Sequence, residues 1–202
     1  MSEILLYGAR LSGHSHRVEA FLRLLDLPYR LIEADATARK TIEFLAKNPL
    51  GQIPVIDDGG LVLADSSSIL VYLAKRYDPQ GGWLPDDPAG AARVQRWLAV
   101  AAGEIKFGPA AARALVRAQR AGDLEGARQI ADRVLRFMDG HLADRAFLAA
   151  ERPTLADLAC YAYTARAPEG GISLEPFPAV RAWLARVEAI PGFLVMPELN
   201  PS

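Results

Sequence analysis

Two serine hydroxyls in a polar loop are the first groups along the chain that could do chemistry. Ser12 follows a short apolar run at 4–7, and Ser15 stands three residues later, where an amphipathic helical pattern begins. In a small α/β layer, ligands bind beyond the carboxyl ends of the parallel strands and near helix N-termini. The hydroxyl of Ser12 could therefore cap the helix or donate a hydrogen bond to a bound thiolate, and Ser15 could cap the same helix.

The peptide bond between Ile53 and Pro54 is a second candidate, for binding. It opens an apolar run that is followed by a Gly-containing turn and a second apolar run, and this pattern predicts a β-hairpin. A trans proline would be tolerated at a sheet edge or at the start of a strand. A cis bond, a minority form even before proline, would turn the N–H and C=O of Ile53 away from the sheet and offer them to an extended peptide ligand. The stretch alone leaves both isomers open.

Asp65 and Ser66 open the helical pattern that follows the hairpin. A helix N-terminus carries unpaired N–H groups and a partial positive charge, so it suits a ligand carboxylate. The same two residues could equally be ordinary N-caps.

His14 and His16 have no evident third partner for a metal, so we expect two surface histidines and no metal site.

These groups need a scaffold, and the spacing of apolar residues in the first 78 positions predicts one. In order, the expected elements are a strand at 4–7, a helix that stops before Pro28, a strand at 29–33, a helix at 41–47, the hairpin, and a helix at 66–77. The β-α-β start requires parallel strands joined by a right-handed crossover. The first part of the chain therefore predicts a β-α-β-α-β-β-α layer.

A stretch rich in Pro and Gly at 79–88 predicts a linker between two domains. We expect an α/β domain at 1–78 and an all-helical domain at 89–202, so the fold class is α/β followed by all-α. Asp87 as N-cap and Pro88 at the first helical position start the first helix beyond the α/β domain.

Apolar stripes with helical spacing run through the second half of the chain. They comprise Val94, Trp97, Leu98 and Ala101; Ile130, Val134, Phe137 and His141; and Val180, Trp183, Leu184 and Val187. Thr154 with Asp157 three residues later is a variant of the capping box. Gly108 and Pro109 should kink or end the first of these helices, and residues 191–202 read as an irregular tail.

Composition argues against several classes of partner. The 202 residues carry 23 Lys and Arg against 24 Asp and Glu, so there is no basic excess for nucleic acid or an anionic membrane. No apolar run approaches the ~20 residues of a bilayer span, and Met1-Ser2-Glu3 does not begin a signal peptide. We therefore expect a soluble, cytoplasmic protein. The single cysteine, Cys160, excludes an intrachain disulfide and is expected to be a buried small hydrophobe.

Several motifs together resemble the cytosolic glutathione transferase superfamily over nearly the whole chain. They are Gln52-Ile53-Pro54-Val55 with the hairpin, Asp65-Ser66 opening a helix, and Pro153-Thr154-Leu155-Ala156-Asp157 in the helical part. The spacing Ser12-x-x-Ser15-x-x-Val18 is similar to the serine-type classes, with theta- and nu-like bacterial members. The resemblance implies a thioredoxin-like domain followed by an all-helical domain. It also implies glutathione transferase activity, glutathione as co-substrate, a small apolar electrophile as acceptor and a two-fold homodimer.

The resemblance also assigns roles to individual residues. Ser12 stabilises the glutathione thiolate, with Ser15 as the alternative; Tyr7, at the end of the first strand, is more typical of core. Ser66 binds the γ-glutamyl carboxylate and Asp65 approaches the amine. The remaining expected contacts are Arg39 or, alternatively, Lys40 at the glycyl carboxylate, Gln52 beside the glutathione backbone, and Ile53 with Pro54 pairing with it.

The acceptor is expected against the loop at 10–11 and the first helix of the second domain. The candidate lining residues there are Ala101, Glu104, Ile105, Phe107 and Gly108. Two other functions remain open. One is a glutathione-binding or regulatory module without catalysis. The other is a glutathione-dependent disulfide reductase or dehalogenase, although the reductases often carry cysteine in the loop where Ser12 stands.

Overall fold

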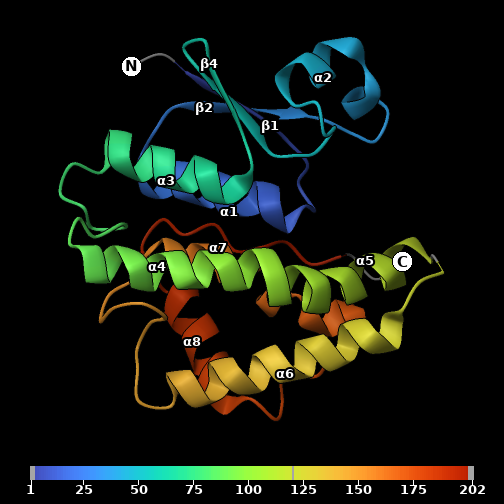
Figure 1. Ribbon diagram of the computed structural model, residues 1–202, viewed down its shortest axis with the longest axis vertical. Coiled ribbons are helices and arrows are strands. Elements are labelled where there is room, and N and C mark those ends of the chain that lie inside the picture. The colour runs from blue at the N-terminus through green and yellow to red at the C-terminus, as the bar shows by residue number, and fades with distance from the viewer. Residues whose placement is uncertain (1–2, 120, 200–202) are drawn as a thin grey trace. The chain divides into compact units, whose positions relative to one another are not determined.

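The computed structural model describes residues 3–119 and 121–199 (Figure 1). Two compact units make up the chain: one extends to Gly82 and includes the segment Pro191–Pro197, and the other comprises Trp83–Ile190 with the residues from Glu198 onward. The expected irregular tail is therefore divided between the units, and its last three residues lie outside the described part, as do Met1 and Ser2. In the described residues, no helix is both long and apolar enough to cross a bilayer.

The first unit has the predicted β-α-β-α-β-β-α order. Its elements are β1 (Ile4–Gly8), α1 (Gly13–Leu24), β2 (Tyr29–Glu33), the 3-10 turn η1 (Ala38–Lys40), α2 (Ile42–Lys47), β3 (Val55–Asp58), β4 (Leu61–Ala64) and α3 (Ser66–Tyr77). The strands are ordered β2-β1-β3-β4; β1 and β2 are parallel and the other pairs antiparallel. This is the layer that the apolar pattern predicts, and it has the thioredoxin-like topology that the resemblance implies.

Alternation along β1 places side chains on both faces of the sheet. Ile4 and Leu6 are fully buried, whereas Tyr7 faces the opposite side and packs with Phe44 of α2 and Val55 of β3. Figure 1 shows α1 and α3 together on one face and α2 on the other. The sheet is thus covered by helices on both faces, and the loops at its ends remain to build a site.

The structure contains the predicted hairpin, and the proline before it follows a cis peptide bond, which is one of the two isomers left open by the sequence. Gly59 and Gly60 have φ of +60° and +97°, which a two-residue hairpin turn of this hand requires at both positions. The Ile53-Pro54 bond is cis. Pro54 precedes β3, which is a central strand between β1 and β4, so the reading as a trans proline on an edge strand is wrong.

The second unit is helical. Its elements are α4 (Pro88–Val100), the π-helical segment η2 (Ala101–Ala110), α5 (Ala111–Ala118), α6 (Leu124–Leu142), α7 (Leu155–Ala165), the 3-10 turn η3 (Ala167–Gly170) and α8 (Pro178–Glu188). The predicted start of α4 is confirmed, because the Asp87 side chain accepts a hydrogen bond from the N–H of Gly90 at 2.8 Å with Pro88 in the first turn.

The helical path does not stop at Pro109. A π-helical segment joins α4 to α5, and Figure 1 shows the two as one nearly continuous path. The wider turns of a π-helix accommodate a proline, which lacks the N–H and crowds the carbonyl of the preceding turn. Gly108 lies against α6 so closely that an added Cβ would be 2.8 Å from the backbone nitrogen of Ala131.

The buried face of α6 is wider than its predicted stripe. The buried residues are Ala127, Ala131, Val134, Leu135, Met138 and Leu142. Phe137 is 38% exposed, and it stacks with Trp97 of α4 at a centroid distance of 5.3 Å. Gly108 of η2 lies against Ala131, so this contact buries a face of α6 that shares Val134 with the predicted stripe.

The side chain of Asp157 links the start of α7 by hydrogen bonds to the loop at Leu148 and to Trp183 of α8. Its carboxylate accepts hydrogen bonds from the N–H and hydroxyl of Thr154, from the N–H of Leu148 at 3.0 Å and from Nε1 of Trp183 at 2.9 Å. The predicted capping box is therefore present. Complete burial raises the pKa of Asp157 above its ordinary value, although the four donated hydrogen bonds act in the opposite direction.

Replacing this carboxylate should be among the most costly changes in the helical unit. We expect Asp157→Ala to lower the free energy of unfolding by roughly 3–5 kcal/mol, because it leaves several buried donors without an acceptor. Asp123→Ala is the matched control, since Asp123 caps α6 at an exposed site through one bond to Gly126; it should cost about 1 kcal/mol. Urea unfolding followed by circular dichroism measures both, and equal losses would contradict the assigned role of Asp157.

Gly108 and Gly103 form a second matched pair, both within η2. Gly108→Ala should destabilise the protein by roughly 1–3 kcal/mol, because the new methyl group would push η2 away from α6. Gly103 faces open space, so Gly103→Ala should stabilise by roughly 0.5–1 kcal/mol. Thermal unfolding of the two variants distinguishes the effects. A Gly108→Ala variant as stable as the wild type would show that the close approach to α6 is dispensable.

Candidate active site

Ser12 is the N-cap of α1. Its Oγ accepts a hydrogen bond from the N–H of Ser15 at 3.2 Å, and its own N–H donates to the carbonyl of Ala9. The residue is half-buried, and within the described part of the chain its O–H has no acceptor. Capping uses a lone pair of this hydroxyl and leaves its proton available, so the cap and the donor to an anion are compatible roles.

Ser15 lies beneath the loop. Its side chain is 1% exposed, and its Oγ accepts a hydrogen bond from the N–H of Ala9 at 3.2 Å. Gly8 approaches Ser15 so closely that an added Cβ would be 2.9 Å from its Cβ and Oγ. The contact of Ser15 is thus with the protein's own loop, which it holds against α1.

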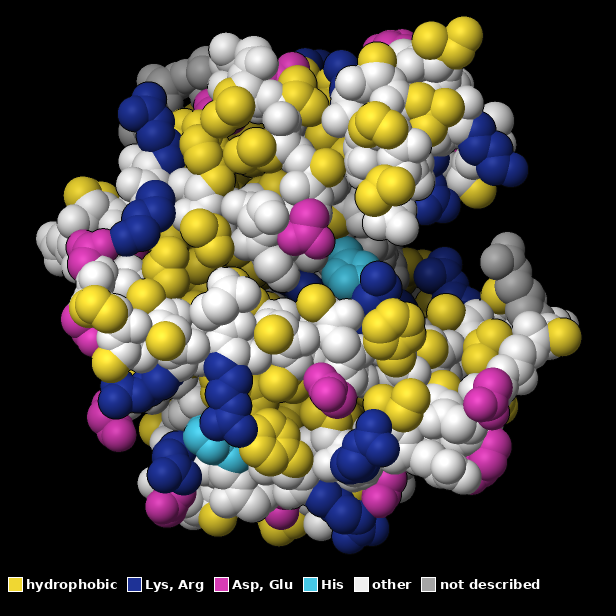
Figure 2. Space-filling view, viewed as in Figure 1, with side chains coloured by type: hydrophobic (Ala, Val, Ile, Leu, Met, Phe, Trp, Pro, Cys, Tyr) yellow, Lys and Arg dark blue, Asp and Glu magenta, His cyan; other side chains and the backbone are white. Residues whose placement is uncertain are grey.

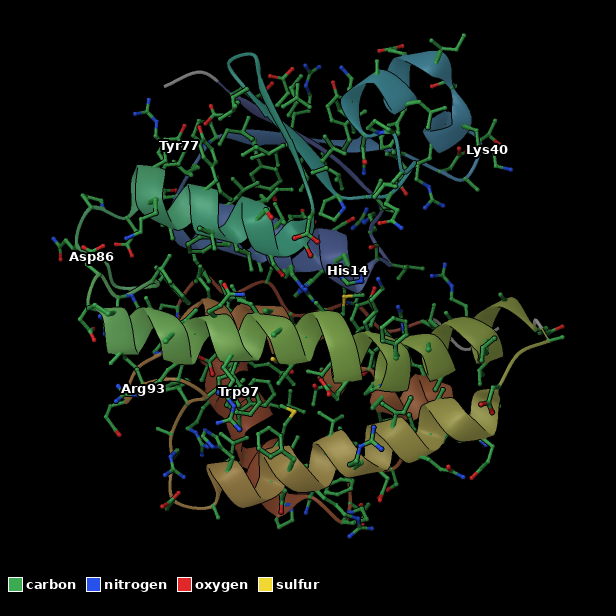
Figure 3. All side chains as sticks on the ribbon, viewed as in Figure 1. His14, Lys40, Tyr77, Asp86, Arg93 and Trp97 are labelled. Atoms are coloured by element: carbon green, nitrogen blue, oxygen red, sulfur yellow. The ribbon has the colours of Figure 1, made fainter. Side chains whose placement is uncertain are left out.

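The N-termini of α1 and α3 are joined by side chains. Ser66 is 4% exposed, and its Oγ accepts a hydrogen bond from Nη1 of Arg17 at 3.3 Å and lies 3.4 Å from Nδ1 of His14. Figure 3 shows His14 at the beginning of α1, beside the beginning of α3. Arg17 is not among the predicted site residues, because an arginine in an amphipathic helix is normally solvated; this one is 1% exposed.

Asp65 caps α3 with one carboxylate oxygen. Oδ1 accepts hydrogen bonds from the N–H groups of Ser67 and Ser68 at 2.9 and 3.0 Å. The other oxygen and the N–H of Ser66 have no hydrogen-bond partner among the described residues. Asp65 has φ of +70°, an uncommon backbone conformation for a residue other than glycine and one that occurs often at functional sites.

The segment from Gln52 to Pro54 is held in place by Asn48, which is not among the predicted site residues. Asn48 is buried at the end of α2; its Nδ2 donates to the carbonyl of Gln52 at 2.8 Å, and its Oδ1 accepts from the N–H of Leu50. The Gln52 side chain is exposed. Across residues 3–119 and 121–199, no group hydrogen-bonds to the N–H or C=O of Ile53. A polar residue at a helix end just before proline was the available signal.

Arg39 and Lys40 differ in their surroundings. Arg39 is half-buried, its Nε donates to the carbonyl of Asp35 at 3.1 Å, and its own carbonyl lies against Gly51, next to Gln52. Gly51 has φ of +60°, and an added Cβ there would be 3.1 Å from that carbonyl oxygen. Lys40 is exposed and lies on the outside of η1, well away from His14 (Figure 3). The structure thus brings Arg39 beside the loop that carries Gln52.

Tyr7 and His16 both have contacts inside the first unit. Tyr7 packs edge-on against Phe44 with ring centroids 6.4 Å apart, as expected for core. His16 is 3% exposed, and its Nε2 is 2.6 Å from the carbonyl oxygen of Leu194, so the prediction of a surface histidine is wrong. The cause is the segment Pro191–Pro197, which the local pattern around His16 does not predict. The described residues contain no group of three or more His, Cys, Asp or Glu side chains placed so that they could hold a metal ion.

The residues proposed to line an acceptor site do not share a face. Ala101 and Ile105 are fully inaccessible and belong to the core of the second unit, as does Gly108. Glu104 is exposed, and Phe107 is 57% exposed. These five therefore cannot all contact one acceptor, because the π-helical turn changes the spacing on which the stripe was based. Cys160 is buried as predicted, with its Sγ 3.7 Å from the carbonyl oxygen of Trp97.

Comparison with known proteins agrees with this architecture in both units. Residues 6–81 match the family model described as glutathione S-transferase, N-terminal domain. Residues 98–191 match the model described as glutathione S-transferase, C-terminal domain. Together the two models account for most of the chain.

Individual relatives match over nearly the full length. Glutathione S-transferase 3 of Zea mays is 34% identical, with 96% of this chain and 92% of the relative covered. Human glutathione S-transferase theta-2 is 33% identical, with 90% and 79% covered. A crystal structure of a possible glutathione S-transferase from Rhodopseudomonas palustris is 35% identical, with a TM-score of 0.89 and 96% and 98% covered. On this evidence, the chain belongs to the glutathione S-transferase family.

Proposed function

We propose that this protein transfers glutathione to small apolar electrophiles and that the Ser12 hydroxyl stabilises the reacting thiolate. The observation that carries the proposal is the Ser12 O–H, which lies at the N-terminus of α1 and has no acceptor within the described residues. A donor at that place can hydrogen-bond to an anion that also experiences the partial positive charge of the helix.

The energetic requirement is modest. A free thiol with a pKa of ~8.5 is only a few per cent ionised at neutral pH, and the thiolate is the nucleophile. Lowering that pKa by about two units requires roughly 2.7 kcal/mol. One hydrogen bond to a charged acceptor supplies about 1.5–3 kcal/mol, and the helix N-terminus adds about 0.3–1 kcal/mol. Ser12 and α1 together therefore suffice without a general base.

The rest of the glutathione molecule has partners in the same unit. The free N–H and C=O of Ile53, after which Pro54 follows in the cis form, suit the main chain of the cysteinyl residue. The N–H and Oγ of Ser66 suit the γ-glutamyl carboxylate, and the second oxygen of Asp65 suits the amine. At the glycyl end we assign Arg39 rather than Lys40, and the exposed amide of Gln52 beside it.

The reaction needs no covalent intermediate on the enzyme. Glutathione loses its thiol proton to solvent, and Ser12 donates a hydrogen bond to the sulfur. The thiolate then forms a carbon–sulfur bond to the electrophile, and a leaving group such as chloride departs with its electron pair. Arg17 and His14 both contact the Oγ of Ser66, and the Arg17 guanidinium adds positive charge near the carboxylate end.

The two alternative functions, a disulfide reductase and a binding module without catalysis, have less support than glutathione transfer. A disulfide reductase would use a cysteine where Ser12 stands, and the only cysteine of the chain is buried in the helical unit. A module without catalysis would not require a hydroxyl proton left available at the start of α1. Neither alternative is favoured by a specific contact.

The proposal also covers the oligomeric state, the domain ranges and the cellular compartment. We infer a two-fold homodimer, supported by apolar side chains on α2 and the loop after it: Ile42 is 89% exposed and Leu50 77%. Figure 2 shows hydrophobic side chains at the surface in the region of α2. The proposed domain ranges are 1–78 for glutathione binding, 79–88 for the linker and 89–202 for the helical domain, from which the segment Pro191–Pro197 returns to the first compact unit. A single cysteine in 202 residues fits a reducing, cytoplasmic setting.

Removing the Ser12 hydroxyl should remove most of the catalysis. We expect Ser12→Ala to lower kcat by about 100-fold with chlorodinitrobenzene as acceptor, because the thiolate loses its hydrogen bond. Ser12→Thr keeps both a hydroxyl and a capping oxygen and should retain part of the activity. Steady-state kinetics at saturating glutathione compare the variants. Undiminished turnover in Ser12→Ala would overturn the assignment.

Ser66 should act on binding rather than on turnover. Ser66→Ala removes a hydroxyl from the proposed carboxylate site, so glutathione should bind about 10-fold more weakly in calorimetry. Ser68 lies in the same helical turn but is exposed, and Ser68→Ala is therefore the matched control, with unchanged affinity. Equal affinities in the two variants would place the carboxylate elsewhere.

A further inference from the structure

A segment from the far end of the chain lies against the start of α1. Residues Pro191–Pro197 come after α8, the last helix of the second unit, yet they belong to the first compact unit. Figure 1 shows this C-terminal segment, in red, running beside α1. Met196 is fully buried, which distinguishes the segment from a solvated tail. The proposed reaction assigns no role to it.

His16 of α1 makes the contact with this segment. The residue is 3% exposed, and its Nε2 lies 2.6 Å from the carbonyl oxygen of Leu194. A carbonyl oxygen only accepts hydrogen bonds, so Nε2 carries the proton and donates it. The Phe193 ring stands edge-on to the imidazole, with the ring centroids 6.1 Å apart. The imidazole is therefore fixed by a hydrogen bond and by an aromatic contact, both to the same segment.

The chain just beyond the segment is anchored as well, within the second unit. Nη1 of Arg166 donates a hydrogen bond to the carboxylate of Glu198 at 2.9 Å. The N–H of Leu199 donates to the carboxylate of Glu169 at 3.2 Å. The segment that holds His16 is therefore continued by residues with partners of their own, and it does not behave as a free chain end.

The helical turn that contains His16 also holds Ser12. The N–H of His16 donates to the carbonyl of Ser12 at 2.8 Å, and the N–H of Ser15 donates to the Ser12 Oγ at 3.2 Å. The Oγ of Ser15 accepts from the N–H of Ala9 at 3.2 Å, which ties the loop before Ser12 to the same turn. A displacement of this turn would therefore displace the Ser12 hydroxyl with it.

We propose that His16 is a positioning residue for the transferase reaction. Its hydrogen bond to Leu194 fixes the first turn of α1 against the C-terminal segment, and this fixes the place from which the Ser12 O–H reaches the thiolate. Hydrogen bonds weaken steeply when their geometry departs from the optimum, so a small shift of the turn would weaken the bond to sulfur. Because His16 acts through Ser12, its role rests on the proposed function.

The test is a pH titration of the thiolate absorbance in the complex with glutathione, combined with steady-state kinetics. His16→Leu keeps the apolar bulk and removes the donor, so we expect the thiol pKa to rise by about one unit. At pH 6 and saturating glutathione, kcat should fall by about 10-fold, because less of the thiol is ionised; at pH 9 it should change little. His16→Gln places an amide N–H at a similar reach and should restore the wild-type thiol pKa.

The thiol pKa separates positioning from a merely structural role. A loss of folded protein would reduce the amplitude of the thiolate absorbance and would leave the midpoint of the titration unchanged. The KM for glutathione should change by less than about twofold in His16→Leu, because the proposed contacts at Ile53 and Ser66 are intact.

A second pair of variants changes the contact from the side of the C-terminal segment. Phe193→Ala removes the ring that stands against the imidazole and should raise the thiol pKa in the same direction as His16→Leu. Val195 lies on the same segment but is 45% exposed, so Val195→Ala is the matched control. The control should leave both the thiol pKa and kcat at their wild-type values.

Ser12→Ala is titrated alongside, so that failure of this proposal is distinct from failure of the proposed function. A wild-type thiol pKa in His16→Leu, with a raised one in Ser12→Ala, would overturn the role of His16 and leave that of Ser12 standing. A wild-type pKa in both variants would overturn both roles. Equal shifts in His16→Gln and His16→Leu would also contradict the proposal, since the donor to Leu194 would then be irrelevant.

Discussion

Main-chain hydrogen bonding at the ends of α1, α3 and β3 is the constraint on which the rest of the site depends. Each helix N-terminus exposes N–H groups that need acceptors. The protein supplies these from Ser12 and Asp65, and in doing so it leaves a defined remainder: the proton of Ser12, one oxygen of Asp65 and the N–H of Ser66. The main chain of Ile53 is left over in the same way at the start of β3. We propose that the glutathione site is built from these unused groups.

The helical unit uses the same chemistry for the opposite purpose. At α7, the carboxylate of Asp157 accepts hydrogen bonds from the cap, from the N–H of Leu148 and from the indole of Trp183. Among the described residues, these three groups all have an acceptor and none is left for a ligand. A buried polar network that is fully satisfied contributes specificity to the fold, whereas a partly satisfied one at a helix end can bind. Whether a cap is structural or functional therefore depends on what remains after capping, and not on which residue type provides the cap.

Features coded by adjacent residues could be predicted from the sequence. The Gly59-Gly60 turn, the start of α4 at Asp87 and Pro88, and the capping box at Thr154 depend on residues a few positions apart. The fold followed from these signals. Prediction failed where distant segments meet: His16 is covered by Leu194, and the stripe through Phe137 is not the most buried face of α6. Local patterns carry no information on which segment returns to cover a residue.

Within the candidate site, too, features coded by adjacent residues were predictable and contacts between distant segments were not. The positions of Ser12, Ile53 and Asp65 at element ends were predictable, because strand ends and caps have local signatures. The roles of Arg17 and Asn48 were not, since the first depends on α3 lying beside α1 and the second on how the chain leaves α2. The π-helical segment around Pro109 likewise reflects the packing of η2 on α6, and it removed the basis for predicting acceptor contacts from a regular stripe.

The central claim is that the Ser12 hydroxyl and the α1 N-terminus ionise the thiol of bound glutathione. The most direct measurement is a pH titration of the ultraviolet absorbance of the thiolate in the binary complex, for the wild type and for Ser12→Ala. The account predicts a thiol pKa about two units below the free value of ~8.5 in the wild type and a return most of the way toward that value in the variant. An equally low pKa in both proteins would contradict it.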